Sequence, residues 1–284
     1  MAEIGSVIGD KYEIISEIAH GKMSVVYLAL DADHKQAWAV KKIQKQAHNG
    51  IDELFVQSAL AESEKLKTLN HSALPRIVDT IDTPETVYFV MDFVLGKSLD
   101  VLVKDEGAQP EERVLDWAKQ LCEVLTYLHS RVPPVILGNI KPGNILCNAN
   151  RLYLIDLSAA VDYRVSSPSG RNIGALYYAA PEVMRGGVLD ERTDIYSFGA
   201  NLYYMLSGDG RPMAMIPYPI QHTSLRFLNP TASAGMVAII NKCLEMNAME
   251  RFQSCTQLMA ALENKPCNKH QRRTLRGLHI FGSK

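Results

Sequence analysis

The chain has 284 residues, a length that suits a fold of two parts, one with a large buried core and one with a smaller core. Its 30 Lys and Arg residues nearly balance its 31 Asp and Glu residues, which argues against a nucleic-acid-binding surface. Five scattered cysteines form no C-x-x-C pair, and no apolar run is long enough for a membrane span, so we expect a reduced, cytoplasmic protein without a disulfide framework, a zinc site or a signal peptide.

Two strands are predicted near the N-terminus, at residues 12–18 and 25–30, where β-branched and aromatic residues flank a turn of small residues. The turn contains Ala19, Gly21 and Ser24. Small side chains let a backbone approach a phosphate, although the Cβ atoms of Ala19 and Ser24 limit the positive φ angles open to glycine. This signal is weak alone, because many hairpins contain small residues only for the turn.

A third strand contains Ala39 and Lys41, which share one face because strand residues alternate with a period of two. A helix is predicted next, because apolar residues recur at spacings of three and four between residues 55 and 69. Glu62 lies on that apolar stripe. A carboxylate that faces a core is costly unless it is paired, so the pattern predicts a cationic partner for Glu62.

The middle of the chain alternates short strands with long helices. A buried strand that runs into a turn is predicted at residues 86–96, and Pro110 begins an amphipathic helix. A hairpin of two short strands follows at 145–155, and it brings Asn144 and Asp156 to the same end. An amide oxygen and a carboxylate at that place suit a hard cation that bridges phosphates.

Three further segments resemble motifs of protein kinases. Residues 136–144, Ile-Leu-Gly-Asn-Ile-Lys-Pro-Gly-Asn, are similar to the catalytic loop, which is usually His-Arg-Asp-Leu-Lys-Pro-x-x-Asn in form. Residues 156–158, Asp-Leu-Ser, stand in place of Asp-Phe-Gly, and residues 174–182 resemble Gly-Thr-x-x-Tyr-x-Ala-Pro-Glu. From about Tyr12 to about Leu262 the chain resembles the bacterial eukaryotic-like (Hanks-type) Ser/Thr protein kinases.

This resemblance implies an α+β fold of two lobes. The small N-lobe, rich in β-strands and with one helix, would cover residues 12–92, and the larger, mainly helical C-lobe would cover 97–264. A hinge at about 92–96 would join them. Residues 1–11 would be an N-terminal extension, and residues 265–284 a basic tail.

The resemblance also implies ATP and Mg²⁺ as cofactors and assigns the site residues. Lys41 and Glu62 would form an ion pair, and Lys141 would act in the catalytic loop. Asp194 would hold the backbone of that loop, and Arg251 would pair with Glu182. The residues implied to bind the nucleotide are Ala19, Gly21, Ser24, Val26, Ala39, Lys41, Met91 as gatekeeper, Asp92, Val94 and Leu146, and those implied to bind the metal are Asn144 and Asp156.

The chain departs from the family pattern where the reaction would occur. Asn139 stands in place of the catalytic aspartate, and an amide cannot serve as a base near neutral pH. Leu137, Gly138 and Ala175 replace the neighbouring histidine, arginine and threonine. We interpret the chain as a pseudokinase that binds Mg-ATP and acts as a switch or scaffold in signalling. The alternatives are a weakly active Ser/Thr kinase and a structural partner domain that binds no nucleotide.

The last segment, residues 265–284, contains six Lys or Arg residues and no acidic residue. Such a tail is most often a solvated end. Our hypothesis is that it contacts an acidic surface, either anionic lipid or an acidic partner protein, which would place a cytoplasmic protein near a membrane. The expected ligands are therefore ATP and a protein partner or substrate, without nucleic acid.

Overall fold

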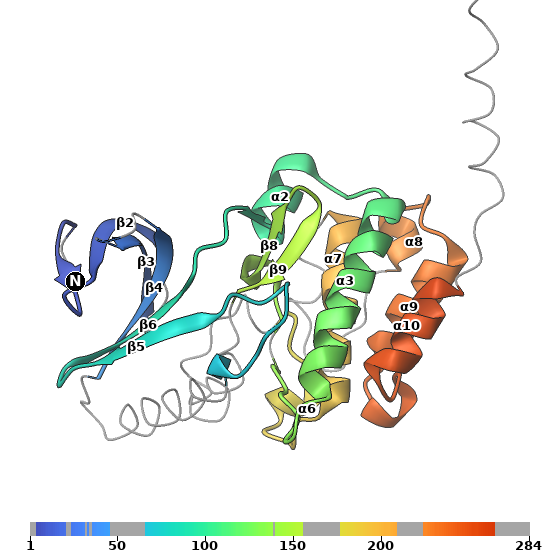
Figure 1. The fold of residues 1–284 in the computed structure, drawn as a ribbon. Helices are drawn as coiled ribbons and strands as arrows, with labels where there is room; N and C mark the ends of the chain where they lie inside the picture. The colour runs from blue at the N-terminus through green and yellow to red at the C-terminus, as the bar shows by residue number, and fades with distance from the viewer. Residues whose placement is uncertain are drawn as a thin grey trace, which may run out of the picture.

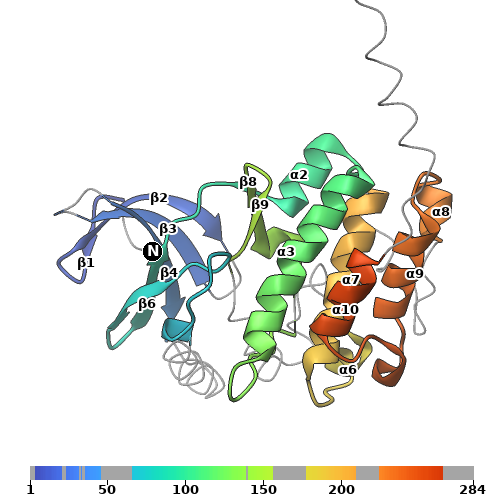
Figure 2. The same ribbon diagram turned by 45° about the vertical axis from the view of Figure 1, so that its right-hand side comes forward.

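The computed structural model describes residues 4–20, 24–31, 33, 36–45, 66–138, 140–155, 177–208 and 224–264. A sheet-rich lobe lies beside a larger helical lobe, and an extended segment after β6 leads from the first into the second (Figure 1, Figure 2). This arrangement confirms the predicted α+β fold of two lobes.

The N-lobe contains one antiparallel sheet with the strand order β1-β2-β3-β4-β6-β5. Its core is formed by alternate residues of these strands, including Ile14, Tyr27 and Val40. The alternation explains why the strands could be predicted from β-branched and aromatic residues. The strands are β1 (Val7–Ile8), β2 (Tyr12–His20), β3 (Ser24–Asp31), β4 (Ala37–Gln44), β5 (Ile77–Asp82) and β6 (Thr86–Asp92).

The segment before Tyr12, predicted as an extension, adds a strand to this sheet. Val7 and Ile8 of β1 pair with Glu13 and Tyr12 of β2. Ile8 is only 7% exposed and belongs to the same core as Tyr12. The N-lobe core therefore draws on residues that precede the first predicted strand.

The C-lobe is built around α7, which is buried along most of its length. Asp190 caps the helix together with Thr193, and Gly208 ends it with a left-handed backbone. The helices are α2 (Leu99–Glu106), α3 (Glu111–His129), α6 (Pro181–Met184), α7 (Glu191–Ser207), α8 (Leu225–Leu228), α9 (Ala234–Cys243) and α10 (Cys255–Glu263), with short 3-10 turns η1 (Pro142–Asn144) and η3 (Ala248–Glu250). A small sheet has the order β7 (Lys97–Ser98), β8 (Ile145–Asn148), β9 (Arg151–Leu154).

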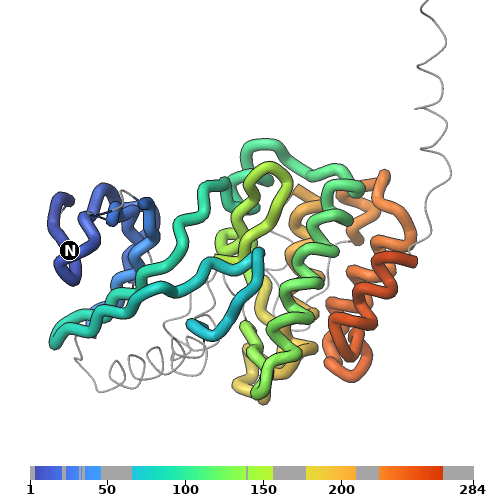
Figure 3. The backbone as a smooth tube through the Cα atoms, in the orientation of Figure 1, coloured from blue at the N-terminus to red at the C-terminus, as the bar shows by residue number. Residues whose placement is uncertain are grey.

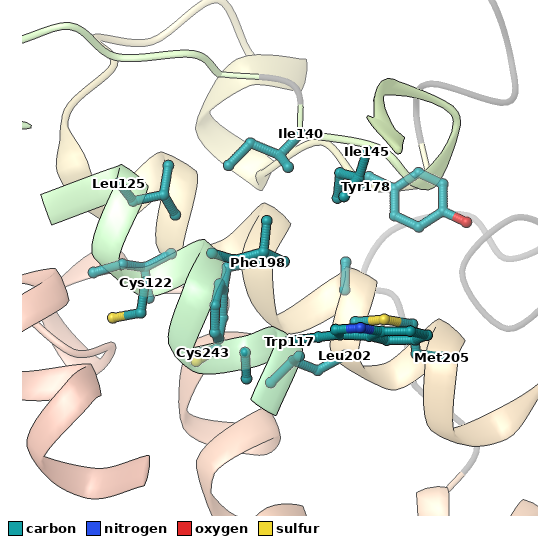
Figure 4. Close-up of a cluster of buried hydrophobic side chains, with 14 of the residues drawn as sticks. Trp117, Cys122, Leu125, Ile140, Ile145, Tyr178, Phe198, Leu202, Met205 and Cys243 are labelled. Atoms are coloured by element: carbon teal, nitrogen blue, oxygen red, sulfur yellow. The ribbon is translucent and has the colours of Figure 1, made fainter. Parts of the chain in front are cut away.

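Apolar side chains of α3 face those of α7 in the C-lobe core, where Trp117 lies close to Leu202 and Met205 (Figure 4). Trp117, Phe198, Leu202 and Met205 are fully buried. Within the described residues, no helix is both long enough and apolar enough to cross a membrane.

Residues 66–74 precede β5 in the chain but pack with the C-lobe. Leu66, Leu69 and Leu74 are buried in the C-lobe core. The Asn70 amide donates to the Tyr127 hydroxyl of α3 at 2.7 Å, and the segment runs beside β9 (Figure 3). This segment therefore links the lobes at a second place, apart from the hinge.

Candidate active site

The backbone before position 139 is held by the buried carboxylate of Asp194, near the start of α7. Its Oδ1 accepts the Gly138 amide at 2.7 Å, and its Oδ2 accepts the Leu137 amide at 3.0 Å. Oδ2 also lies 2.9 Å from His129 Nε2 at the end of α3. A buried carboxylate is tolerated when it is hydrogen-bonded in this way. Asp194 therefore fixes the loop, as the resemblance implied.

Gly138 has a left-handed backbone, with φ of +71°. A Cβ atom at this position would lie 3.1 Å from Leu189 Cδ1, so the neighbour would have to move. Glycine adopts this conformation without steric cost, whereas other residues do not. The residue that replaces the family's arginine thus fits the backbone that Asp194 imposes.

The backbone after position 139 is held from the same helix. The Asn201 side-chain amide donates to the carbonyl oxygen of Ile140 at 2.9 Å and to that of Ser197 at 2.7 Å. Ile140 itself is only 2% exposed. Asn139 lies outside the described residues, but the residues on both sides of it are anchored to α7.

The predicted metal ligand Asn144 ends the turn η1, directly before β8. Its amide donates to Lys141 O at 2.9 Å, and its carbonyl oxygen accepts the Ile155 amide at 3.0 Å. Ile155 is the last described residue before Asp156, so the hydrogen bond places Asn144 beside the end of β9. Asp156 lies outside the described residues, and the pairing of the two metal ligands stays a prediction. Carboxylate and amide oxygens suit Mg²⁺, which usually takes few protein ligands beside the phosphates of a nucleotide.

The predicted nucleotide-binding residues of the N-lobe lie opposite one another on neighbouring strands. Val26 of β3 pairs with Lys41 of β4 and with Ala19 of β2, and Ala39 pairs with Met91 of β6. Because Ala39 and Lys41 are two residues apart, they share one face of the sheet. Ser24 begins β3. Gly21 and Glu62 lie outside the described residues, so the ion pair of Lys41 and Glu62 remains a prediction.

The hinge begins at Asp92, whose side chain is bound to Arg76. The Asp92 carboxylate accepts the Arg76 amide at 3.0 Å, Nε at 2.9 Å and Nη2 at 3.0 Å. These hydrogen bonds lower the pKa of Asp92. Val94 follows in the same segment, and Leu146 of β8 pairs with Ser98 of β7 just beyond it. The structure thus brings the predicted hinge close to Leu146, the predicted nucleotide-binding residue of the C-lobe.

The predicted pair of Arg251 and Glu182 is confirmed. Nη1 and Nη2 of Arg251 donate to the two carboxylate oxygens of Glu182 at 2.7 and 2.9 Å, and the Arg251 side chain is completely buried. Thr193 adds a hydrogen bond of 3.0 Å to the same carboxylate. Burial raises the pKa of Glu182, but the hydrogen bonds and charge of Arg251 outweigh it, so the net pKa is lowered.

Sequence reasoning missed three residues that support the site: His129, Asn201 and Arg76. The His129 ring lies between Asp194 and the Cys255 thiol, whose sulfur is 3.6 Å from Nδ1. For Asn201, the sequence offered one signal: it is a polar residue within the largely apolar segment that forms α7. For Arg76 no local pattern existed, because its partner Asp92 is sixteen residues away.

Comparisons with known proteins agree with this geometry. The family model for the protein kinase domain matches residues 12–262. The chain is 28% identical to a probable serine/threonine-protein kinase of Clostridium acetobutylicum, over 92% of the chain and 41% of that protein. It is 30% identical to the serine/threonine-protein kinase PknB of Mycobacterium tuberculosis, over 90% of the chain and 43% of that protein. The chain therefore spans about two fifths of the length of these relatives.

Among solved structures, the kinase domain of Mycobacterium tuberculosis PknI matches 94% of the chain with a TM-score of 0.75 and 21% identity, which supports the fold alone. The family match covers most of the chain and includes the catalytic loop, the hinge and the pair of Arg251 and Glu182. On these grounds the chain belongs to the protein kinase domain family.

Proposed function

We propose that this kinase domain is a pseudokinase, which holds Mg-ATP between its lobes but transfers phosphate inefficiently and acts as a switch or scaffold in signalling. The observation that carries the proposal is an asparagine at the base position of a loop whose neighbouring backbone is fully anchored. Asparagine has the shape of aspartate but cannot accept the proton of a substrate hydroxyl. General-base assistance typically contributes roughly 10² to 10⁴ in rate.

Nucleotide binding is supported by the residues that remain. Lys41 lies on the same strand face as Ala39, beside Val26, and Asn144 is fixed at the end of the hairpin that leads to Asp156. When bound, Mg²⁺ would neutralise charge on the phosphates. In this proposal Lys41 and Glu62 orient the phosphates, Asn144 and Asp156 hold the metal, and the hinge backbone from Asp92 to Val94 binds the adenine edge.

A thermal melt with Mg-ATP tests the nucleotide claim. At a concentration of 100 times the dissociation constant, a ligand stabilises the folded state by about 2.7 kcal/mol, which a melt detects. We expect a shift with wild type and a smaller one with Lys41→Met, while Lys11→Met serves as a control on an exposed lysine of the N-lobe. An unchanged wild-type melting temperature at millimolar Mg-ATP would favour the structural partner domain.

Transfer of radiolabelled phosphate to generic protein substrates tests the catalytic claim. We expect little incorporation by wild type and only a small gain with Asn139→Asp, because Gly138 and Ala175 remain unchanged. Efficient phosphorylation by wild type would contradict the pseudokinase proposal. Slow but steady incorporation by wild type would favour the weakly active kinase, since a loose transition state demands little of a base.

We also propose that the protein is cytoplasmic and that residues 265–284, which lie outside the described residues, attach it to an acidic surface. Each basic residue near an anionic membrane contributes about 1 kcal/mol. Co-sedimentation with vesicles rich in phosphatidylserine, at low and high salt, compares the full chain with a chain that ends at Asn264. We expect the full chain to bind the vesicles at low salt, and we expect high salt or the truncation to abolish this binding. If neither protein binds the vesicles, the lipid contact is excluded.

A further inference from the structure

A groove of about 710 Å³ opens where the two lobes meet beside the hinge. Its walls come from residues 70–76, from the hinge residues 92–95, and from Asn148 and Tyr153 of the hairpin β8–β9. The predicted nucleotide-binding residues of β3 and β4 and Leu146 are not among the described residues that line it. The groove is therefore a separate surface from the proposed nucleotide site, and it shares only hinge residues with it.

The walls of the groove are tied to one another by hydrogen bonds. Leu154 of β9 donates its amide to Ala73 O at 2.9 Å, which joins the hairpin to the loop. The Asp92 amide donates to Arg76 O at 3.0 Å, and the side chains of the two residues form a bidentate ion pair. Because these bonds connect all three walls, the groove is preformed and a ligand would not have to organise it.

The lining combines hydrogen-bonding groups with an exposed aliphatic side chain. Asn70, Ser72, Asn148 and Tyr153 present amide and hydroxyl groups, and Leu95 is 70% exposed beside them. The groove is largely open to solvent, so it would not enclose a small molecule on most sides, as ligand pockets do. It suits a peptide, which has backbone hydrogen-bonding groups along its length and apolar side chains at intervals.

The neighbouring strand favours an extended peptide. β5 begins at Ile77, directly after Arg76, and it forms one edge of the N-lobe sheet. Val78 on this strand is 41% exposed. A segment that lies in the groove could therefore continue along a sheet edge, which is a common way in which proteins bind extended peptides.

The charge of the groove favours an acidic peptide. Arg76 and Asp92 are the charged residues of the lining, and the Arg76 side chain is 62% exposed whereas that of Asp92 is 26% exposed. The more accessible half of the ion pair is thus the cation. Arg151 adds a second guanidinium, which lies 5.9 Å from the centre of the Tyr153 ring. An acidic side chain at this surface would meet Arg151 and the exposed side of the Arg76 guanidinium, whose Nε and Nη2 are bound to Asp92.

We propose that this hinge groove docks an extended, acidic segment of a partner protein, with an aliphatic side chain of that segment packed on Leu95. The proposal rests on the scaffold role proposed above and gives that role a binding surface. It does not require a nucleotide, so its test is made with nucleotide-free protein and stands apart from the test of Mg-ATP binding.

The test is a selection from phage-displayed random dodecapeptides on the full wild-type chain, without nucleotide. The selected peptides are then made synthetically, and their affinities are measured by calorimetry. We expect peptides with acidic and aliphatic residues, and a loss of about tenfold or more in affinity for Leu95→Asp and for Arg76→Glu. Hydrogen exchange should show protection at residues 70–76 and 92–95 when peptide is bound.

Two matched variants serve as controls. Val188→Asp places the same charge on another exposed apolar residue, which is 90% exposed, and Arg226→Glu reverses an exposed arginine on α8. Both should bind the peptides as wild type does. Selected peptides that bind Leu95→Asp as tightly as wild type, or a selection that enriches no peptide, would overturn the proposal. So would a wild-type dimer that Leu95→Asp dissociates, because the groove would then bind a second copy of the chain.

Discussion

The support beneath the catalytic loop and the strands that face the proposed nucleotide site are built by different means. Beneath the loop, buried polar groups are enclosed by hydrogen bonds. Asp194 accepts from two backbone amides and lies 2.9 Å from His129 Nε2, and Arg251 donates to both oxygens of Glu182. On the N-lobe strands, Ala39 and Lys41 are positioned by backbone pairing with β3 and β6. They share one face of the sheet because successive strand residues point to opposite faces.

The difference shows that the shape of the loop and its chemistry depend on different residues. The side chains that hold Leu137, Gly138 and Ile140 are Asp194 and Asn201, which both belong to the buried helix α7. The backbone of Leu137, Gly138 and Ile140 is therefore held by groups other than the side chain at position 139.

The largest effect should come from a break in the buried support. We expect Arg251→Met to destabilise the protein by roughly 3 to 5 kcal/mol, because Glu182 would keep a partly buried charge without its main partner. The free energy of unfolding in urea measures the loss. Lys104→Ala removes an exposed pair with Asp100, in which Lys104 is 68% exposed, and should cost at most about 0.5 kcal/mol.

The double variant Arg251→Met, Glu182→Gln sharpens this test. If the unpaired charge causes the loss, the double variant should be more stable than Arg251→Met alone. An equal loss in both would mean that packing around Arg251, rather than the ion pair, supports this part of the C-lobe.

A smaller effect should follow from Gly138→Ala. A non-glycine residue with a left-handed backbone costs about 1 to 2 kcal/mol, and Leu189 would also have to move. Gly143→Ala is the matched control, because no atom lies within 4 Å of the added Cβ and its φ is not in the left-handed region. Equal stability of both variants in urea would show that Asp194 does not impose the backbone of the loop. The same strain would reduce the benefit of Gly138→Arg in any attempt to restore catalysis.

The smallest effect concerns pH. The pKa of Glu182 is lowered from 4.5 in the folded state, so its contribution to stability is complete above about 4.5 and is lost as the pH falls through the folded pKa. The loss is modest because burial opposes the hydrogen bonds of Arg251. Urea unfolding of wild type between about pH 6 and pH 3 should show this decline. In Arg251→Met the decline attributable to Glu182 should disappear, since burial alone raises the pKa of a carboxyl.

Much of the fold could be predicted because its signals are local. The alternation in β2 to β4, the spacing in α3 and the turn between β8 and β9 each lie within a few residues. The strand β1 was missed because two paired residues are too short a pattern, and β5 was missed although Ile77, Val78 and Ile81 are typical of strands.

The site could be predicted in part, because the kinase motifs fix the order of its residues. The pair of Arg251 and Glu182 and the role of Asp194 were found from that resemblance and are confirmed. The bond between Arg76 and Asp92 could not be predicted, since it depends on how β5 and the hinge pack together. Glu62, Asn139 and Asp156 lie outside the described residues, so their roles stay predictions.

The anchoring of residues 66–74 has a consequence for motion between the lobes. Asn70 and Ala73 are bonded to α3 and β9, so this segment belongs mechanically to the C-lobe although it lies between two strands of the N-lobe. If the lobes rotate relative to one another, the chain at Pro75–Arg76 and the predicted hinge at 92–96 are two of the places where it would have to bend. Such a rotation moves Lys41 relative to Leu66, so the distance between β4 and this anchored segment is a direct reporter of closure.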